Sequence, residues 1–316
     1  MDCAIWHKQI YMRLPRPTVR AQARPQRRRG MRAGLPFSIY IQTNLCYLCH
    51  VKISVPSIFM AKMIKKISNT LKGKKVLLTG ATGGVGKEVA KKLREAGANL
   101  LLISKDEGKL KDLQKTLFGD KKLGEIKYLA LDFNNLDDVE RAIPEIISTF
   151  GGHIDILINN AGMGYHGKIE TIDTNELKEV FTINVLSPII ITSRLLSIIS
   201  KSDAGHIVNI SSILGSRSME RTASYTASKH ALTGFTKVLR QETARRKIRV
   251  TTIEPGAINT QFVQRTHESE AKDHFSERKL IKIPPETIAS WIIKVIESDP
   301  MVCPEVIQIM PQEQII

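Results

Sequence analysis

The chain has 316 residues, enough for one large α/β domain with an appendage. Three of its four cysteines precede residue 50, so the rest of the chain holds only one and cannot contain a disulfide framework. That cysteine usage is typical of a reducing compartment, so we expect a cytoplasmic protein. The formal net charge of +16 is concentrated in residues 1–59, which hold ten Lys and Arg and one acidic residue. The remainder has only a modest excess of basic residues, so no nucleic-acid partner is expected.

Residues 1–62 are expected to form a basic extension that is disordered or acts in targeting. The segment is arginine-rich, as transit peptides are, so import into an organelle is the alternative location. Polar residues interrupt its apolar part, and no run reaches the ~18 apolar residues of a stable membrane span. Residues 46–50 match the pattern of c-type haem attachment, but no cytochrome-like domain surrounds them. A start at Met60 or Met63 is the other interpretation, since both precede the first predicted strand.

The first predicted strand, residues 75–78, leads into a glycine-rich segment at 79–86 and then into a helix over residues 88–96. A strand, a glycine-rich turn and a helix in this order are the context of a nucleotide site. Glycines let the backbone approach a pyrophosphate, and the helix N-terminus offers unpaired N–H groups and the positive end of a dipole. An ordinary tight turn is the alternative.

Further apolar strands alternate with helical patterns along the chain. They are predicted at residues 99–103, 126–130, 154–158, 205–210, 248–253 and 305–309. Such alternation predicts an α/β fold, a Rossmann-type doubly wound parallel sheet of about seven strands with helices on both faces, in one domain over residues 63–316. Ligands bind such sheets beyond the carboxyl ends of the strands, where the polar and glycine-containing motifs fall. The irregular segment 261–284 is expected to be a lid or a helix pair beside the site.

A proton-transfer site is predicted around Tyr225 and Lys229, which lie four residues apart and share a face if this segment is helical. The Lys229 ammonium would lower the pKa of the phenol from its usual ~10. Ser212 lies thirteen residues before the tyrosine and can hold the same substrate oxygen, with Ser211 as the alternative. Alone, this tyrosine–lysine spacing is often just a solvated helix face, so its weight depends on the other motifs.

Those motifs together resemble the short-chain dehydrogenase/reductase (SDR) family from about residue 74 to about residue 310. In chain order they are T-G-A-T-G-G-V-G at 79–86, Leu131-Asp132, N-N-A-G at 159–162, Asn184 in I-N-V-L-S-P, I-S-S at 210–212, Y-T-A-S-K at 225–229 and P-G-A-I-N-T at 255–260. One departure is Ser187, where relatives often carry glycine, which affects the expected close helix packing.

The resemblance implies an oxidoreductase that interconverts a carbonyl and a secondary alcohol by hydride transfer on a small molecule, in a homodimer or homotetramer. It implies that the catalytic residues are Ser212, Tyr225, Lys229 and Asn184, the last positioning a water that links the lysine to solvent. Substrate contacts are expected from Ser212, Met163, Leu214 and Tyr225. A 3-oxoacyl-carrier-protein reductase and a non-catalytic NADP(H)-sensing protein are the alternative functions, and no metal is expected.

The end of the second predicted strand decides the expected cofactor. An acidic residue there binds the ribose 2′-hydroxyl of NAD(H), but here Ser104 takes that position and Lys105 follows as a cation for a 2′-phosphate. We therefore expect NADP(H), with NAD(H) as the alternative if Asp106 faces the ribose instead. The full set of expected cofactor-binding residues is Thr79, Gly80, Thr82, Gly84, Val85, Gly86, Ser104, Lys105, Asp132, Phe133, Asn159, Ala161, Gly162, Tyr225, Lys229, Pro255, Gly256, Ile258 and Thr260.

Overall fold

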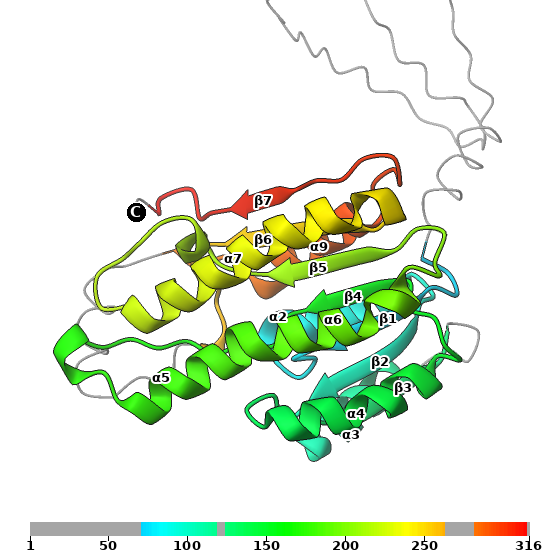
Figure 1. The fold of residues 1–316 in the computed structure, drawn as a ribbon, viewed down its shortest axis with the longest axis horizontal. Helices are drawn as coiled ribbons and strands as arrows, with labels where there is room; N and C mark the ends of the chain where they lie inside the picture. The colour runs from blue at the N-terminus through cyan, green and yellow to red at the C-terminus, as the bar shows by residue number, and fades with distance from the viewer. Residues whose placement is uncertain (1–70, 119–123, 263–280, 315–316) are drawn as a thin grey trace, which may run out of the picture. The chain divides into compact units, whose positions relative to one another are not determined.

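The apolar runs that predicted strands form one parallel sheet in the computed structural model, which describes residues 71–118, 124–262 and 281–314. The strands are β1 (Lys75–Thr79), β2 (Asn99–Ser104), β3 (Ile126–Ala130), β4 (Ile156–Asn159), β5 (His206–Ile210), β6 (Arg249–Pro255) and β7 (Val306–Ile309). Their order across the sheet is β3-β2-β1-β4-β5-β6-β7 (Figure 1). The predicted fold is confirmed. The extension at 1–62 and residues 263–280 of the predicted irregular segment lie outside the described residues.

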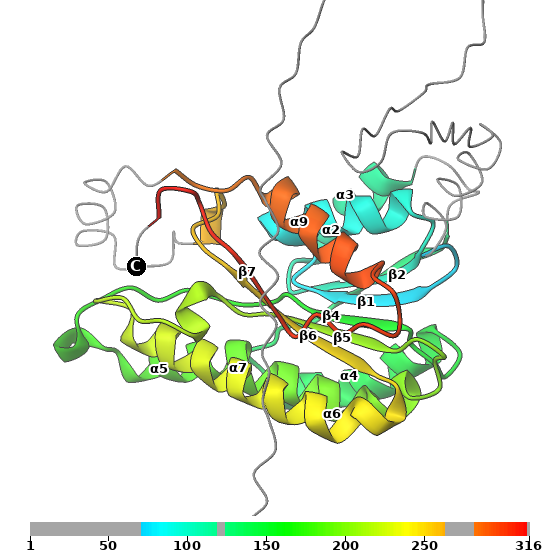
Figure 2. The same cartoon turned by 90° about the horizontal axis from the view of Figure 1, so that it is seen from above.

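Helices cover both faces of the sheet (Figure 2). On one face lie α2 (Gly84–Glu95), α3 (Glu107–Leu117) and α9 (Pro285–Ile296). On the other lie α4 (Leu136–Thr149), α6 (Ser187–Ile199) and α7 (Ala223–Thr243), with α5 (Thr174–Phe181) beside α7. Short helical turns complete the described part: η1 (Ile169–Thr171), η2 (Thr182–Leu186), η3 (Ile213–Gly215) and η4 (Ala244–Arg246).

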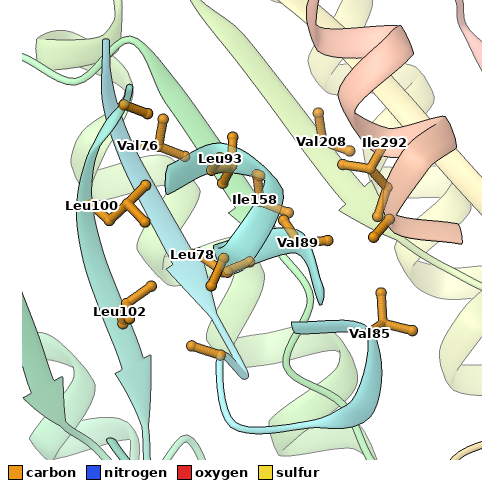
Figure 3. Close-up of a cluster of buried hydrophobic side chains, with 14 of the residues drawn as sticks. Val76, Leu78, Val85, Val89, Leu93, Leu100, Leu102, Ile158, Val208 and Ile292 are labelled. Atoms are coloured by element: carbon orange, nitrogen blue, oxygen red, sulfur yellow. The ribbon is translucent and has the colours of Figure 1, made fainter. Parts of the chain in front are cut away.

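Two hydrophobic clusters, one on each face, hold the layers together. Because successive strand residues point to opposite faces, Val76 and Leu78 of β1 face the layer of α2 and α9, whereas Leu77 faces the layer of α4 and α6. The first cluster interlocks strand side chains with Val89 and Leu93 of α2 (Figure 3). Burial of apolar side chains on both sides explains why inner strands such as β1 and β4 read as continuous apolar runs.

The strand order reverses between β1 and β4. The chain moves outward from β1 through β2 to β3, returns to β4 on the other side of β1, and continues outward to β7. Leu77 of β1 therefore pairs with Leu101 of β2 on one side and with Leu157 of β4 on the other. This reversal separates the loops that follow β1 and β4 and places the ligand site of such sheets beyond them.

The helical run before β5 contains a segment that its sequence does not reveal. It runs as α5, then the π-helical turn η2, then α6. This run, Thr174–Ile199, has the length and mean hydropathy (1.6) of a membrane-crossing helix, but half of its most apolar window is buried inside the domain. Such burial is typical of a core helix, so the run is weak evidence for a span.

Candidate active site

The glycine-rich turn after β1 is shaped by close backbone contacts. Gly80 has a φ of +64°, and a Cβ on it would lie 2.8 Å from the Cα of Ala161. A Cβ on Gly86 would strike the carbonyl oxygen of Gly80. These contacts let the helix begin at Gly84, inside the motif and four residues before its predicted start. No side chain caps this end and its first turn holds no acidic residue, so its N–H groups suit an anion.

Asn160, which the sequence interpretation did not include, holds this turn in place. Its Nδ2 donates to the carbonyl oxygens of Thr79 (3.0 Å) and Gly80 (3.1 Å). The Asn159 side chain is instead buried in the helix layer, where its Nδ2 donates to Thr192 Oγ1 (3.0 Å) and Asn209 Oδ1 (2.8 Å). Asn159 ends β4 and Asn160 follows it directly, so the alternation of side chains along the strand could have indicated that only one of the pair reaches the turn.

The end of β2 meets the glycine-rich turn through a contact between hydroxyl groups. The Oγ of Ser104 lies 2.6 Å from the Oγ1 of Thr82. Lys105 is exposed. Asp106 is engaged elsewhere, because its Oδ1 accepts the backbone N–H of Lys109 (2.9 Å) as the cap of α3 and its Oδ2 pairs with the Lys109 ammonium at 3.0 Å. The acidic residue that would favour NAD(H) is therefore occupied as a helix cap.

The loop after β3 is tied to the start of α6. The Asp132 carboxylate is exposed and accepts the backbone N–H of Asn134 at 3.0 Å. Phe133 is buried, and its carbonyl oxygen accepts the Ser187 hydroxyl at 2.6 Å. Ser187, the departure from the family pattern, is itself fully buried. Its hydroxyl therefore fits without opening the helix packing and adds a hydrogen bond that glycine cannot make.

Ser212 and Tyr225 come together from different elements. Ser212 follows β5 and caps η3, with its Oγ accepting the N–H of Leu214 at 3.1 Å, and its side chain lies close enough to that of Tyr225, near the start of α7, to lower the pKa of the phenol. Ser211 points away, since its Oγ lies 2.9 Å from Thr233 Oγ1 behind the turn. Of the two serines, only Ser212 has its hydroxyl beside the phenol.

Lys229 and Asn184 complete the arrangement. The buried Lys229 Nζ lies 5.7 Å from the centre of the Tyr225 ring and donates to the Ile210 carbonyl at 3.1 Å. Asn184 sits in the π-helical turn η2, a geometry that often marks functional positions. Its side chain exchanges two hydrogen bonds of 2.9 Å with the backbone of Met163 and donates a third to Ser228 at 3.0 Å.

The electrostatics of the pair differ from the expectation. Burial raises the pKa of Tyr225 to about 12, against the opposing effect of the Ser212 hydrogen bond. Burial lowers the pKa of Lys229 to about 8. The pKa of Tyr225 is therefore raised rather than lowered, because burial of the phenol outweighs the effect of Ser212, and Lys229 is not among the causes of the shift. At neutral pH the phenol is protonated and can donate.

An apolar wall lies beside the phenol. Met163 and Tyr165 are buried together with Val180 in a small cluster that contacts Tyr225, and Leu214 is buried in η3. Contact of Met163 and Leu214 with a substrate stays a prediction.

Phe262 is a further wall residue that the sequence interpretation did not single out. Its ring meets Tyr225 edge to face at 6.0 Å between centroids. A Cβ on Gly164 would come within 3.1 Å of that ring, so the glycine leaves room for it.

The segment after β6 reaches back to α2. A Cβ on Gly84 would strike the Thr260 side chain, so Thr260 lies against the first turn of the helix. Gly256 follows Pro255 and lies against Gln314, whose Oε1 accepts the Ala257 N–H at 2.9 Å. The side chains of Val85 and Ile258 pack on the core cluster, so these two residues can offer a ligand only their backbone groups.

The residues present fit a dinucleotide. The bare first turn of α2 suits a pyrophosphate, and a side chain at Gly84 or Gly86 would fill the turn. Gly162 lies within van der Waals reach of both Asn184 and Lys229, which joins the dinucleotide loops to the catalytic residues. Among the described residues there is no cluster of His, Cys, Asp and Glu that could hold a metal ion.

Known proteins are similar to this chain in sequence and in fold. The mouse protein "Dehydrogenase/reductase SDR family member 7B" is 34% identical over 240 residues, which is 75% of this chain and 73% of the relative. The bovine "Dehydrogenase/reductase SDR family member 11" is 33% identical over 76% of this chain and 96% of its own length.

Among solved structures, an actinorhodin polyketide ketoreductase variant with NADPH aligns with a TM-score of 0.65 and 26% identity, over 77% of this chain and 97% of the other. Serine dehydrogenase with NADP+ aligns with a TM-score of 0.69 and 24% identity, over 76% and 96%. The family model described as short chain dehydrogenase matches residues 74–271. With the turn, the sheet and the Ser212–Tyr225–Lys229 cluster in place, these matches show that the chain belongs to the short-chain dehydrogenase family, nicotinamide-dinucleotide oxidoreductases that act on CH–OH groups.

Proposed function

We propose that the protein is an NADP(H)-dependent carbonyl reductase that interconverts a ketone or aldehyde with its alcohol. The observation that carries this proposal is the convergence of Ser212, Tyr225 and Lys229 beside an apolar wall, at the edge of the sheet where the glycine-rich turn lies. The bound cofactor would supply or accept the hydride. The ketoreductase with NADPH is a relative of the same fold whose name states carbonyl reduction.

Tyr225 acts as the general acid. Its pKa of about 12 keeps the phenol protonated at neutral pH, so it can donate a proton to the carbonyl oxygen as negative charge develops there. Ser212 hydrogen-bonds the same oxygen and stabilises that charge. Lys229, whose pKa burial lowers to about 8, still carries a proton at neutral pH and contributes a positive charge behind the phenol.

Asn184 holds the floor of this site. Its side-chain amide clamps the backbone of Met163 and reaches Ser228, one residue before Lys229. It thereby fixes the loop after β4 against α7, so that the wall residue and the lysine keep a constant separation. The water-positioning role implied by the resemblance stays a prediction.

The preference for NADP(H) rests on the end of β2. Ser104 faces the glycine-rich turn, Lys105 is exposed beside it, and Asp106 is occupied by the cap of α3. A 2′-phosphate would therefore meet a hydroxyl and a cation rather than a carboxylate, and Arg or Lys contacts to phosphate are among the stronger hydrogen bonds. The wall of Met163, Leu214 and Phe262 favours a largely apolar substrate.

A homodimer or homotetramer is the expected assembly. Large apolar side chains are exposed on the helix layer opposite α2, namely Leu186 in η2 (42%) and Val238 in α7 (53%). Burial of such residues between copies would remove apolar surface from water. Sedimentation analysis of the purified protein measures the assembly directly, and a monomer at micromolar concentration would contradict it.

Turnover and binding assays test the function. NADPH and NADH are titrated by fluorescence, and a set of ketones, 3-hydroxy acids, steroids and retinoids is assayed with each cofactor. We expect tighter binding of NADPH and reduction of apolar ketones. Binding of NADPH without turnover of any compound would favour a cofactor-sensing protein instead.

A further inference from the structure

Glu254 is a buried carboxylate to which the proposed reaction gives no role. It is the penultimate residue of β6, directly before Pro255, and it is only 1% exposed to solvent. Its hydrogen-bond partners in the described part of the chain are neutral side chains rather than cations. A carboxylate without a cation is costly to bury, so its retention here points to a specific structural task.

One oxygen of Glu254 anchors the end of the η3 turn. The Ser216 hydroxyl donates to Oε2 at 2.8 Å, and Gln308 Nε2 donates to the same oxygen at 2.9 Å. Gln308 also donates to Ser216 Oγ at 3.0 Å, which closes a triangle of three hydrogen bonds. Gln308 pairs with Glu254 across β6 and β7, so the triangle is built on the rigid sheet. Ser216 is thus fixed by a strand as well as by its own turn, where its Oγ also lies 3.3 Å from the Ile213 carbonyl.

The other oxygen of Glu254 reaches the start of the same turn. Thr233 Oγ1 donates to Oε1 at 3.4 Å and lies 2.9 Å from Ser211 Oγ, which in turn lies 3.3 Å from the Lys229 carbonyl. Gly215 seats the turn on this chain of contacts, since a Cβ there would lie 2.6 Å from Thr233 Oγ1. The network therefore runs from Glu254 to the backbone of the catalytic helix.

These contacts bracket Ser212. Ser211 precedes it and Ser216 ends the turn that it caps, and both are bound, directly or through Thr233, to the same carboxylate. We propose that Glu254 is a positioning residue that holds Ser212 in register with Tyr225. The inference rests on the proposed function in one respect, the catalytic task of Ser212. The hydrogen-bond network itself is a property of the folded chain and does not depend on that function.

Glu254→Gln tests the inference with little change of shape. The substitution replaces an acceptor oxygen by a donor NH2, so the contact with Ser216 or Thr233 must reverse its direction or the contact with the Gln308 NH2 must break. Glu305→Gln is the matched control, since Glu305 lies just before the neighbouring strand β7 and pairs with Arg240 at the surface. Hydrogen exchange of the amides at 212–217 in the full chain without cofactor should accelerate in Glu254→Gln and stay unchanged in the control.

The second readout is turnover. With NADPH and phenanthrenequinone as the probe substrate, kcat should fall between about tenfold and 10²-fold in Glu254→Gln, as small displacements of a catalytic group do, while the Kd for NADPH stays unchanged. On a Ser212→Ala background the same substitution should cost nothing further, because the residue acts through Ser212. Should Glu254→Gln fail to fold, Ser216→Ala removes the Ser216 corner of the triangle, leaves the Gln308 and Thr233 contacts of Glu254 in place, and is read in the same way.

The outcomes separate the inference from the proposed function. Unchanged exchange at 212–217, or an equal loss of kcat with and without Ser212, overturns the role of Glu254. Unchanged turnover in Ser212→Ala overturns instead the catalytic role of that serine, and the exchange measurement then still decides whether Glu254 holds the turn.

Discussion

The hydroxyl oxygens of Thr82 and Ser104 lie 2.6 Å apart, which joins the glycine-rich turn to the end of β2. In folds of this type, the residues near this strand end contact the ribose 2′ group that distinguishes NADP(H) from NAD(H). One hydroxyl donates to the other, and the Asp106 carboxylate is directed to the cap of α3, where it accepts the N–H of Lys109. The charge beside this pair is therefore set by Lys105.

Lys105→Ala should weaken NADPH binding and leave NADH binding unchanged. A charge-assisted contact with a phosphate is worth about 1.5–3 kcal/mol, so the Kd for NADPH should rise roughly tenfold or more. Fluorescence titration of both cofactors measures the effect. Lys111→Ala, which removes an exposed lysine that pairs with Glu107 on α3, is the control. Equal Kd values for the two cofactors in the unchanged protein would contradict the assignment.

Tyr225→Phe should abolish turnover while cofactor binding persists. The phenol is the proposed proton donor, and general acid catalysis contributes about 10²–10⁴-fold. Because burial holds the tyrosine pKa near 12, alcohol oxidation, which needs the phenolate, should accelerate as pH rises from 7 to 10. Steady-state rates in both directions and NADPH titration check these outcomes. Residual activity within about tenfold of the unchanged protein would remove Tyr225 from the role.

Much of the fold could be predicted because strand burial repeats along the chain. The run at residues 75–78 reads as a strand because its apolar residues are covered on both faces, and the structure places β1 there. The run at residues 126–130 forms β3, an edge strand that is only partly buried. The start of α2 was predicted four residues late, since glycines disfavour helices and only their tertiary contacts explain why Gly84 and Gly86 adopt one.

The site was less predictable where the direction of a side chain decides which residue reaches it. The sequence places Asn159 and Asn160 side by side, but which of them faces the glycine-rich turn depends on the pleat of β4. The π-helical turn at Asn184 and the raised pKa of Tyr225 both arise from packing around buried polar groups. Phe262 had no motif to mark it, because its place over the phenol comes from the fold of the loop after β6.

Phe262→Ala should change which substrates are accepted rather than the chemistry. The ring covers one side of Tyr225 and is 40% exposed, so its removal opens space next to the phenol. We expect the KM for bulky aryl ketones to fall relative to that for small ketones, with kcat for small ketones changed by less than about tenfold, since an aromatic pair is worth ~0.5–1.5 kcal/mol. Kinetics on a homologous ketone series measure the ratio. Phe118→Ala, at an exposed position after α3, is the control, and an unchanged ratio in Phe262→Ala would exclude this wall role.

His206 makes the folded state sensitive to acid. It is fully buried in β5, with its Nε2 2.9 Å from Thr251 Oγ1, and burial, with the Arg249 charge, lowers its pKa to about 3 from its usual 6.5. Between these values the unfolded chain binds a proton that the folded chain does not, so stability is complete above about pH 6.5 and is lost as pH falls toward 3.

The expected loss from this group is ~1.4 kcal/mol per pH unit once the unfolded histidine is protonated. His206→Gln should therefore show a shallower fall in the free energy of unfolding from pH 6.5 to 4.5, measured by urea denaturation, even if it is less stable at pH 7. His230→Gln is the matched control, because His230 is exposed on α7 and only its Nδ1 contacts the Thr226 carbonyl. Parallel pH profiles for the unchanged protein and His206→Gln would show that the carboxylates, not this histidine, set the acid limit.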